Sequence, residues 1–164
     1  MEKVNSESSK SMLEELNKRI DKLRAYEIEN SEELPMSIQM QPYLYDFFPE
    51  NKTITIAFPV QKKQLNPNNA MIGGLITNAV DIACGLLIFA IDGFIIPPTI
   101  TMTTNFINAI FFDDTLLIEA KVESWGKRII NISARGTSKN NGKTIVTSTS
   151  SFVSVESIKE SLKK

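Results

Sequence analysis

Apolar and polar residues alternate along much of the second half of the chain. From Thr115 to Trp125, apolar residues at 116, 118, 120 and 122 alternate with the charged residues Glu119, Lys121 and Glu123, and apolar and polar residues alternate again from Ile130 to Arg135. A third segment, Thr144 to Val155, is rich in β-branched residues. A period of two predicts strands that bury one face, and β-branched residues are typical of strands. We expect three long strands here.

Short turn sequences separate these three segments. Gly126-Lys127 follows the first, and Asn140-Asn141-Gly142 precedes the third. Asn-Gly tolerates a positive φ and favours a tight hairpin. Hairpins join antiparallel neighbours, so we expect an antiparallel sheet with one apolar face.

Further strands are expected upstream. Lys52 to Val60 alternates cleanly, and Thr99 to Ile107 has a similar pattern. Met36 to Phe48 is patterned more loosely, and Pro42 within it indicates an edge strand or a bend. Gln64 to Asn69 is rich in Asn and Pro and predicts a loop.

One long apolar segment interrupts the strands, from Met71 to Ile91. Its length would allow a membrane span. It contains Gly73-Gly74, Asn78 and a central aspartate, however, and an aspartate at the centre of a span costs about 3 kcal/mol. We therefore expect a buried helix with a sheet wrapped around it, and no membrane.

The two ends of the chain predict further helices. Leu13, Leu16, Ile20 and Leu23 recur at steps of three and four, which predicts an amphipathic helix from Ser11 to about Tyr26, with a capping box at Ser11. Glu156 to Lys164 is expected to form a short surface helix. The predicted organisation is therefore an N-terminal helix and linker over 1–35, one main domain over 36–155 and a tail over 156–164.

Composition narrows the possible chemistry. The net charge is −1 and the isoelectric point about 5.6, so a nucleic-acid partner is not expected. There is no histidine, which excludes Ser-His-Asp and Cys-His hydrolysis and leaves no histidine ligands for a metal site. A lone cysteine, Cys84, cannot form an internal disulfide, and residues 1–6 lack the apolar core of a secretion signal. We expect a cytoplasmic protein.

Asp81 is the only charged residue between Gln64 and Ile91. An ionised carboxylate in an apolar helix must be hydrogen-bonded, neutralised or open to a pocket. It could be purely structural, bonded to nearby hydroxyls or amides. It could instead be a nucleophile or general base held in a dry cleft.

Gly73-Gly74 lies two helical turns before Asp81. Glycines at a helix start let backbone N–H groups approach a ligand closely, and such groups can bind an oxygen on which negative charge develops. A simple junction between loop and helix is the other interpretation. Together with a buried acid downstream, the pair indicates half of a hydrolytic site.

The spacing of these residues resembles a known signature. Asn66, then Ile72-Gly73-Gly74 after six residues, then Asp81 seven residues past the second glycine, is similar to the motif of PaaI-like hotdog-fold thioesterases. The resemblance extends through the strand after the helix and the turn at Gly126-Lys127, over about 36–155. It implies an α+β hotdog fold, in which an antiparallel sheet of about five or six strands wraps around one long apolar helix.

The resemblance also implies roles for individual residues. Asp81 would be the general base or nucleophile that acts on a thioester carbonyl. The Gly73 N–H, with Asn66 from across a subunit interface, would polarise the carbonyl oxygen. Thr99 falls where a hydroxyl positions the water. Gly74, Lys127 and Arg128 would contribute to coenzyme A binding, although a solvated hairpin turn explains Lys127 and Arg128 equally well.

Substrate and partners follow from the same resemblance. It implies hydrolysis of an acyl-CoA without a metal or a separate cofactor, by a homo-oligomer that is a dimer or a tetramer. The histidine of the family motif is Ile72 here. That departure keeps open a non-catalytic protein that binds acyl-CoA or lipid. A hotdog dehydratase is less compatible with a chain that has no histidine.

Overall fold

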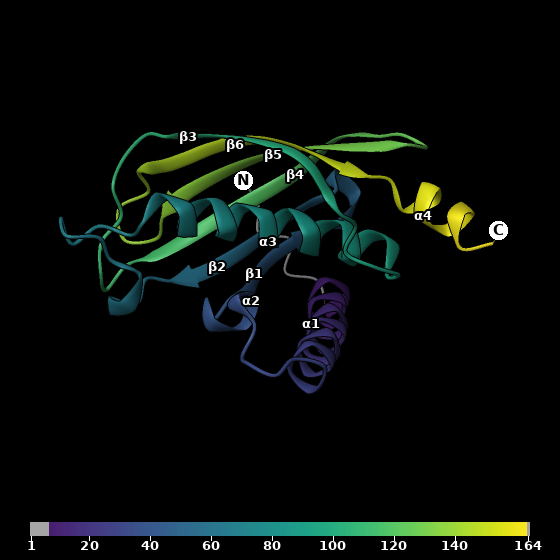
Figure 1. Ribbon diagram of the computed structural model, residues 1–164, viewed down its shortest axis with the longest axis horizontal. Coiled ribbons are helices and arrows are strands. Elements are labelled where there is room, and N and C mark those ends of the chain that lie inside the picture. The colour runs from purple at the N-terminus through teal and green to yellow at the C-terminus, as the bar shows by residue number, and fades with distance from the viewer. Residues whose placement is uncertain (1–6, 164) are drawn as a thin grey trace. The chain divides into compact units, whose positions relative to one another are not determined.

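In the computed structural model, the alternating segments form one six-stranded antiparallel sheet (Figure 1). Its order is β1-β2-β4-β5-β6-β3, so β1 and β3 are the edge strands. The strands are β1 (Tyr43–Phe48), β2 (Thr53–Pro59), β3 (Thr99–Phe106), β4 (Thr115–Trp125), β5 (Ile129–Ser138) and β6 (Thr144–Val153). The sheet of about five or six strands that the sequence predicts is confirmed.

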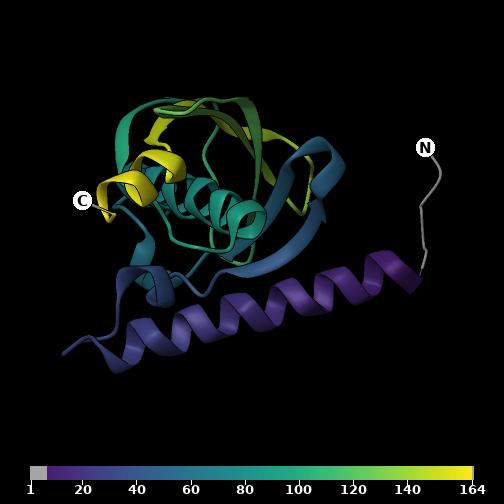
Figure 2. The same cartoon turned by 90° about the vertical axis from the view of Figure 1, so that its right-hand side faces the viewer.

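The long apolar segment is a single helix, α3 (Gly73–Asp92), which lies in the concave face of the sheet. Figure 2 looks nearly along α3 and shows the strands curling around it. Side chains on the sheet-facing side of the helix and on the inner face of the strands are buried together, among them Ala79, Val80, Ala83, Leu87, Ile56, Phe58, Ile118 and Ile132. This burial explains the period of two in the strands, because only the inward residues need to be apolar.

Close packing between strands requires one glycine. A Cβ on Gly136 would lie 2.4 Å from Val146 Cγ1 and 2.7 Å from Ile118 Cδ1. Both distances are shorter than any ordinary carbon contact, so no larger residue fits in the middle of β5 without displacing its neighbours.

By length and composition alone, α3 could cross a membrane. Within the described residues, 61% of its most apolar window is buried inside the structure, as expected of the core helix of a globular fold. Gly93 ends α3 with a left-handed φ of 76°, and its N–H donates to the Phe89 carbonyl.

The structure describes residues 7–163 and divides into two compact units, Met1–Gln41 and Pro42–Lys164. Residues 1–6, on which part of the localisation argument rests, lie outside the described residues. The first unit contains α1 (Glu7–Glu29) and α2 (Met36–Gln39). The second contains the sheet, α3, a C-terminal helix α4 (Val155–Ser161), and the 3-10 turns η1 (Pro49–Asn51) and η2 (Lys62–Gln64).

Two local predictions are wrong. Ser11 is not the start of the first helix, since α1 already includes Glu7, and no Gly or Pro stops the helix from extending upstream of Ser11. Met36–Gln39 is a helix and not the beginning of a strand. Pro35 precedes this helix at a position that proline tolerates, and Gln41 then turns the chain with a φ of 50° before β1. The edge position that Pro42 indicated is confirmed for β1.

Candidate active site

Asp81 lies midway along α3 and is half-buried. Its Oδ1 accepts a hydrogen bond of 2.7 Å from the Thr99 hydroxyl. Within residues 7–163, no lysine or arginine forms an ion pair with it. The carboxylate is therefore oriented by one hydroxyl and not neutralised by a cation, which leaves Oδ2 available to a proton or a carbonyl carbon.

The sheet topology brings Thr99 to this position. Thr99 is the first residue of β3 and lies opposite Phe152 on β6. Just before it, the Pro98 carbonyl accepts a hydrogen bond from the Val153 N–H, 3.0 Å long. The hydroxyl is thus anchored through the backbone of a central strand, and β3 itself has a free edge.

The Cys84 thiol is buried one helical turn beyond Asp81. Burial raises the pKa of the Cys84 thiol from 9.0 to about 12; the nearby Ser150 hydroxyl opposes this rise, and the charge of Asp81 adds to it. Ser150 Oγ is near the sulfur but makes no hydrogen bond of its own among the described residues. A thiol held neutral in this way is a poor nucleophile, so Cys84 is not a candidate for covalent chemistry.

We expect Cys84 to resist a thiol reagent such as DTNB at pH 8 in the folded protein and to react fully after unfolding. Because the folded-state pKa exceeds the unfolded value of 9.0, the unfolded chain loses the proton first, and the free energy of unfolding should fall as the pH rises from about 9 toward about 12. Absorbance at 412 nm, with and without denaturant, measures the labelling. Rapid stoichiometric labelling of the folded protein would contradict a sealed thiol.

The N-terminus of α3 presents two unused backbone donors. Leu75 and Ile76 donate to the Ile72 carbonyl, whereas the N–H groups of Gly73 and Gly74 have no acceptor among the described residues. Ile72, the N-cap residue, gives no side-chain cap. These N–H groups lie at the positive end of the helix dipole, where an oxygen with developing negative charge is stabilised.

Phe106 packs over this helix end. A Cβ on Gly73 would lie 3.1 Å from the Phe106 ring, whereas a Cβ on Gly74 would meet nothing within 4 Å. Gly73 therefore also has a packing role, because it makes room for an aromatic ring that is 54% exposed. Gly74 borders open space.

Asn66 shapes the loop before α3. Its Oδ1 accepts hydrogen bonds from the N–H of Asn68 (2.9 Å) and of Ala70 (3.2 Å). Its backbone N–H donates to the Ala70 carbonyl at 2.8 Å. The side-chain oxygen is therefore committed to the loop, and the Nδ2 group, without a partner among the described residues, is left to donate outward.

One chain does not bring all these groups together. Gly73 and Asp81 are eight residues apart on a straight helix, which separates them by about 12 Å along its axis. The chain pairs Asp81 with Thr99 and places Asn66 near the Gly73 end of α3. One small group in contact with Asp81 therefore cannot also reach the Gly73 N–H of the same chain.

Lys127 and Arg128 are exposed in the β4–β5 turn. The Arg128 carbonyl accepts a hydrogen bond from the Ser154 N–H at 2.8 Å, so the turn lies at the same end of the sheet as Thr99, which is opposite Phe152. Neither side chain has an ion-pair partner among residues 7–163. Both side chains are therefore exposed at the end of the sheet that carries Thr99.

Asn78, which lies one turn before Asp81, is a polar residue of this helix to which the sequence pattern assigned no role. Its Nδ2 atom is buried and has no hydrogen-bond partner among the described residues. An amide on an otherwise apolar helix was a signal that could have been used.

No group of three or more His, Cys, Asp or Glu side chains that could hold a metal ion occurs within residues 7–163.

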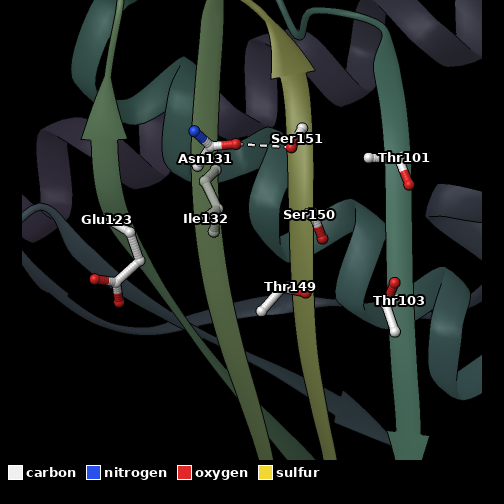
Figure 3. A pocket seen from close by; sticks show the side chains of 8 residues that line it. All are labelled: Thr101, Thr103, Glu123, Asn131, Ile132, Thr149, Ser150 and Ser151. Carbon is white, nitrogen blue, oxygen red and sulfur yellow. Dashed lines mark hydrogen bonds between the residues drawn. The ribbon is translucent and has the colours of Figure 1, made fainter.

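A shallow hollow of about 360 Å³ lies on the outer face of the sheet, which is the face turned away from α3 (Figure 3). Hydroxyl and amide side chains dominate its lining, with Glu123 at one side and a hydrogen bond of 2.7 Å from Ser151 to Asn131 within it. In this view α3 lies behind the sheet. The hollow is thus separated from Asp81 by the sheet and takes no part in that site.

An antiparallel sheet wrapped around one long apolar helix is the hotdog fold, as the sequence predicts. Residues 68–145 match the family model described as the thioesterase superfamily, a stretch that includes α3, β3, β4 and β5. The matched residues are therefore similar to a thioesterase superfamily domain, and the resemblance inferred from the Asn66–Asp81 motif is confirmed at that level. No curated protein matches the chain in sequence.

Several solved structures share this fold at low sequence identity. Zebrafish thioesterase superfamily member 2 has a TM-score of 0.66 and 18% identity over 76% of this chain and 88% of that one. The Escherichia coli PaaI protein of the phenylacetic acid degradation operon has a TM-score of 0.64 and 17% identity over 71% and 86%. A hypothetical thioesterase from Streptococcus pneumoniae, solved with coenzyme A, has a TM-score of 0.61 and 19% identity over 69% and 85%.

Proposed function

We propose that this protein hydrolyses an acyl-CoA thioester to a free acid and coenzyme A, with Asp81 as the general base or nucleophile. The observation that carries the proposal is the half-buried Asp81 carboxylate, oriented by Thr99 and free of any ion pair among the described residues, in a region similar to a thioesterase superfamily domain. A similar fold has been solved with coenzyme A. The proposal assigns no separate cofactor and places the reaction in the cytoplasm.

Asp81 can act in two ways. As a general base it takes a proton from water while the water oxygen bonds to the thioester carbon, the C–S bond breaks, and the coenzyme A thiolate is then protonated. As a nucleophile its carboxylate displaces the thiolate and forms an anhydride, which water hydrolyses to regenerate Asp81 and release the acid. Thr99 holds the carboxylate in position in both cases and, in the first, also places the water.

The carbonyl oxygen needs donors that one chain does not supply next to Asp81. We infer that a second copy provides them: its Gly73 N–H and Asn66 Nδ2 would face Asp81 of the first copy, and the reverse pairing would build a second site. Both donors are unused within the described chain. Two such donors, aimed at the oxyanion of the tetrahedral intermediate, stabilise it more than the neutral substrate.

The surface around β3 supports such self-association. β3 is an edge strand, and apolar side chains along it and around the start of α3 are exposed: Ile72, Ile100, Phe106, Ile107 and Phe111. Exposed apolar side chains next to an unpaired strand edge mark an interaction surface. Pairing of two β3 strands would cover both. Lys127 and Arg128 would then remain at the rim for the phosphates of coenzyme A.

A thiol-release assay tests the proposal. We expect at least one member of a panel of short, long and aromatic acyl-CoAs to be hydrolysed, with a turnover on the order of 1 s⁻¹ and stoichiometric free acid. The buried Cys84 keeps the DTNB background low.

The same panel decides the second candidate function, a non-catalytic acyl-CoA or lipid-binding protein, which is favoured by Ile72 in place of the motif histidine. Micromolar binding of acyl-CoA by calorimetry without thiol release would favour that alternative. Neither binding nor release by any member would contradict both.

A further inference from the structure

The segment Gly93–Pro98 joins the end of α3 to Thr99, the residue that orients Asp81. Since a short connection has little slack, the position of the hydroxyl depends on how this segment is held. The structure fixes the segment at three points: on the surface of α3, at the C-terminal helix α4, and at the end of β6.

The first point is Ile96, which packs directly on the backbone of α3. A Cβ on Gly85 would lie only 2.7 Å from Ile96 Cγ2. Gly85 is four residues after Asp81 and therefore on the same side of the helix. The isoleucine thus occupies the space that a larger residue at position 85 would fill, on the side of α3 that carries Asp81.

The second point is Lys159 of α4. Its Nζ donates to both oxygens of Asp92, at 2.8 and 3.1 Å, and lies 5.1 Å from the centre of the Phe94 ring. Asp92 is the last residue of α3, where the helix dipole disfavours a carboxylate, so a cation there is stabilising. The Asp92 side chain is 20% exposed, and one ammonium group therefore holds both the helix end and the start of the segment.

The third point lies at the end of β6. The Val153 N–H donates to the Pro98 carbonyl, and α4 begins two residues later at Val155. Two contacts therefore connect the same two parts of the chain. The Val153–Pro98 hydrogen bond joins β6 to the end of the segment, and Lys159 of α4 joins Asp92 at its start. A shift of α4 would be transmitted to both ends of Gly93–Pro98.

We propose that Lys159 is a positioning residue, which acts through Asp92, Phe94 and the segment to hold the Thr99 hydroxyl on Asp81. The inference rests on the proposed thioesterase function and extends it to a residue that lies beyond the matched region, which ends at residue 145. Lys159 Nζ donates its hydrogen bonds to Asp92 and none to Asp81. Its effect should therefore appear in turnover and not in substrate binding.

The main test compares Lys159→Met with Lys159→Arg. Methionine keeps the apolar stem and removes the charge, so we expect kcat to fall about tenfold with KM within about twofold of wild type. Arginine keeps the charge and should restore most of kcat. Lys143→Met, at an exposed lysine of the β5–β6 hairpin, is the matched control and should leave kcat unchanged. Equal kcat in Lys159→Met and wild type would overturn the proposal.

A double-mutant cycle separates positioning from a general loss of stability. In a Thr99→Val background the hydroxyl is gone, so Lys159→Met should lower kcat no further. If the two substitutions instead multiply, Lys159 acts independently of Thr99 and the proposal fails.

An NMR measurement that needs no substrate tests the role of Lys159 separately from the proposed thioesterase activity. In protein labelled at threonine methyl groups, the Thr99 resonance should move in Lys159→Met and return in Lys159→Arg, while the Thr147 methyl on β6 stays in place. If the wild-type protein hydrolyses no acyl-CoA, the proposed function is wrong, and this resonance alone decides the coupling. An unmoved Thr99 resonance would refute the coupling even in an active enzyme.

Discussion

Replacing Asp81 with asparagine is expected to lower kcat for acyl-CoA hydrolysis by about a thousandfold, without a change in fold. An amide can neither accept a proton from water nor attack a carbonyl. Its Oδ1 can still accept the hydrogen bond from Thr99, so the side chain should keep its place. The thiol-release assay measures the loss, and circular dichroism with a thermal melt measures the fold.

Asp113→Asn is the matched control for this change. Asp113 is exposed and has a φ of 66°, a conformation that asparagine tolerates at least as well as aspartate. Asp113 lies outside α3, and its side chain is assigned no role in the site. We expect this control to keep wild-type turnover. Full activity in Asp81→Asn, with the fold intact, would remove Asp81 from the mechanism.

Asn66→Asp is expected to lower kcat about a hundredfold, with a melting temperature close to that of wild type. The carboxylate keeps the oxygen that binds the N–H groups of Asn68 and Ala70, so the loop should survive. It lacks the Nδ2 donor and adds a negative charge where the oxyanion forms. Steady-state kinetics and a thermal melt measure the two effects separately.

Mixing the two defective variants tests whether the site is shared between copies. In a dimer whose sites combine Asp81 of one chain with Asn66 of the other, each mixed dimer has one intact site. After unfolding and refolding together in equal amounts, activity should recover to about a quarter of wild type, because half the dimers are mixed and have one good site of two. No recovery, although mixed dimers form, would mean that both residues act within one chain.

The sheet could be predicted from the sequence because each strand exposes one face. The alternation in Thr115–Trp125 predicts β4 with the bounds that the structure has, since its inward residues all meet α3 or the neighbouring strands. The strand predicted from Met36 to Phe48 is wrong only in its first part, where Met36–Gln39 is a helix. That part lacks a clear period of two, and the proline before it and the turn at Gln41 determine its structure.

The candidate site was predictable only in part. A lone acid in an apolar helix made Asp81 conspicuous, but nothing in the spacing of 18 residues shows that Thr99 reaches it. The resemblance to a family singled out Thr99 as the residue that positions the water, but it did not predict the hydrogen bond to Asp81. The ion pair of Lys159 with Asp92 joins residues 67 positions apart, and a charged residue near a helix end looks like any solvated residue until the chain is folded.

Thr99 is the first residue of β3, which is an edge strand. If two β3 strands pair, activity would therefore depend on the protein concentration. Under the proposed arrangement, the strand that delivers the hydroxyl is the one that meets its counterpart in another molecule, so assembly and alignment of the reactive groups are one event. Specific activity would then fall on dilution below the dissociation constant, and saturating substrate would strengthen the association. The concentration of the protein itself would then control its specific activity.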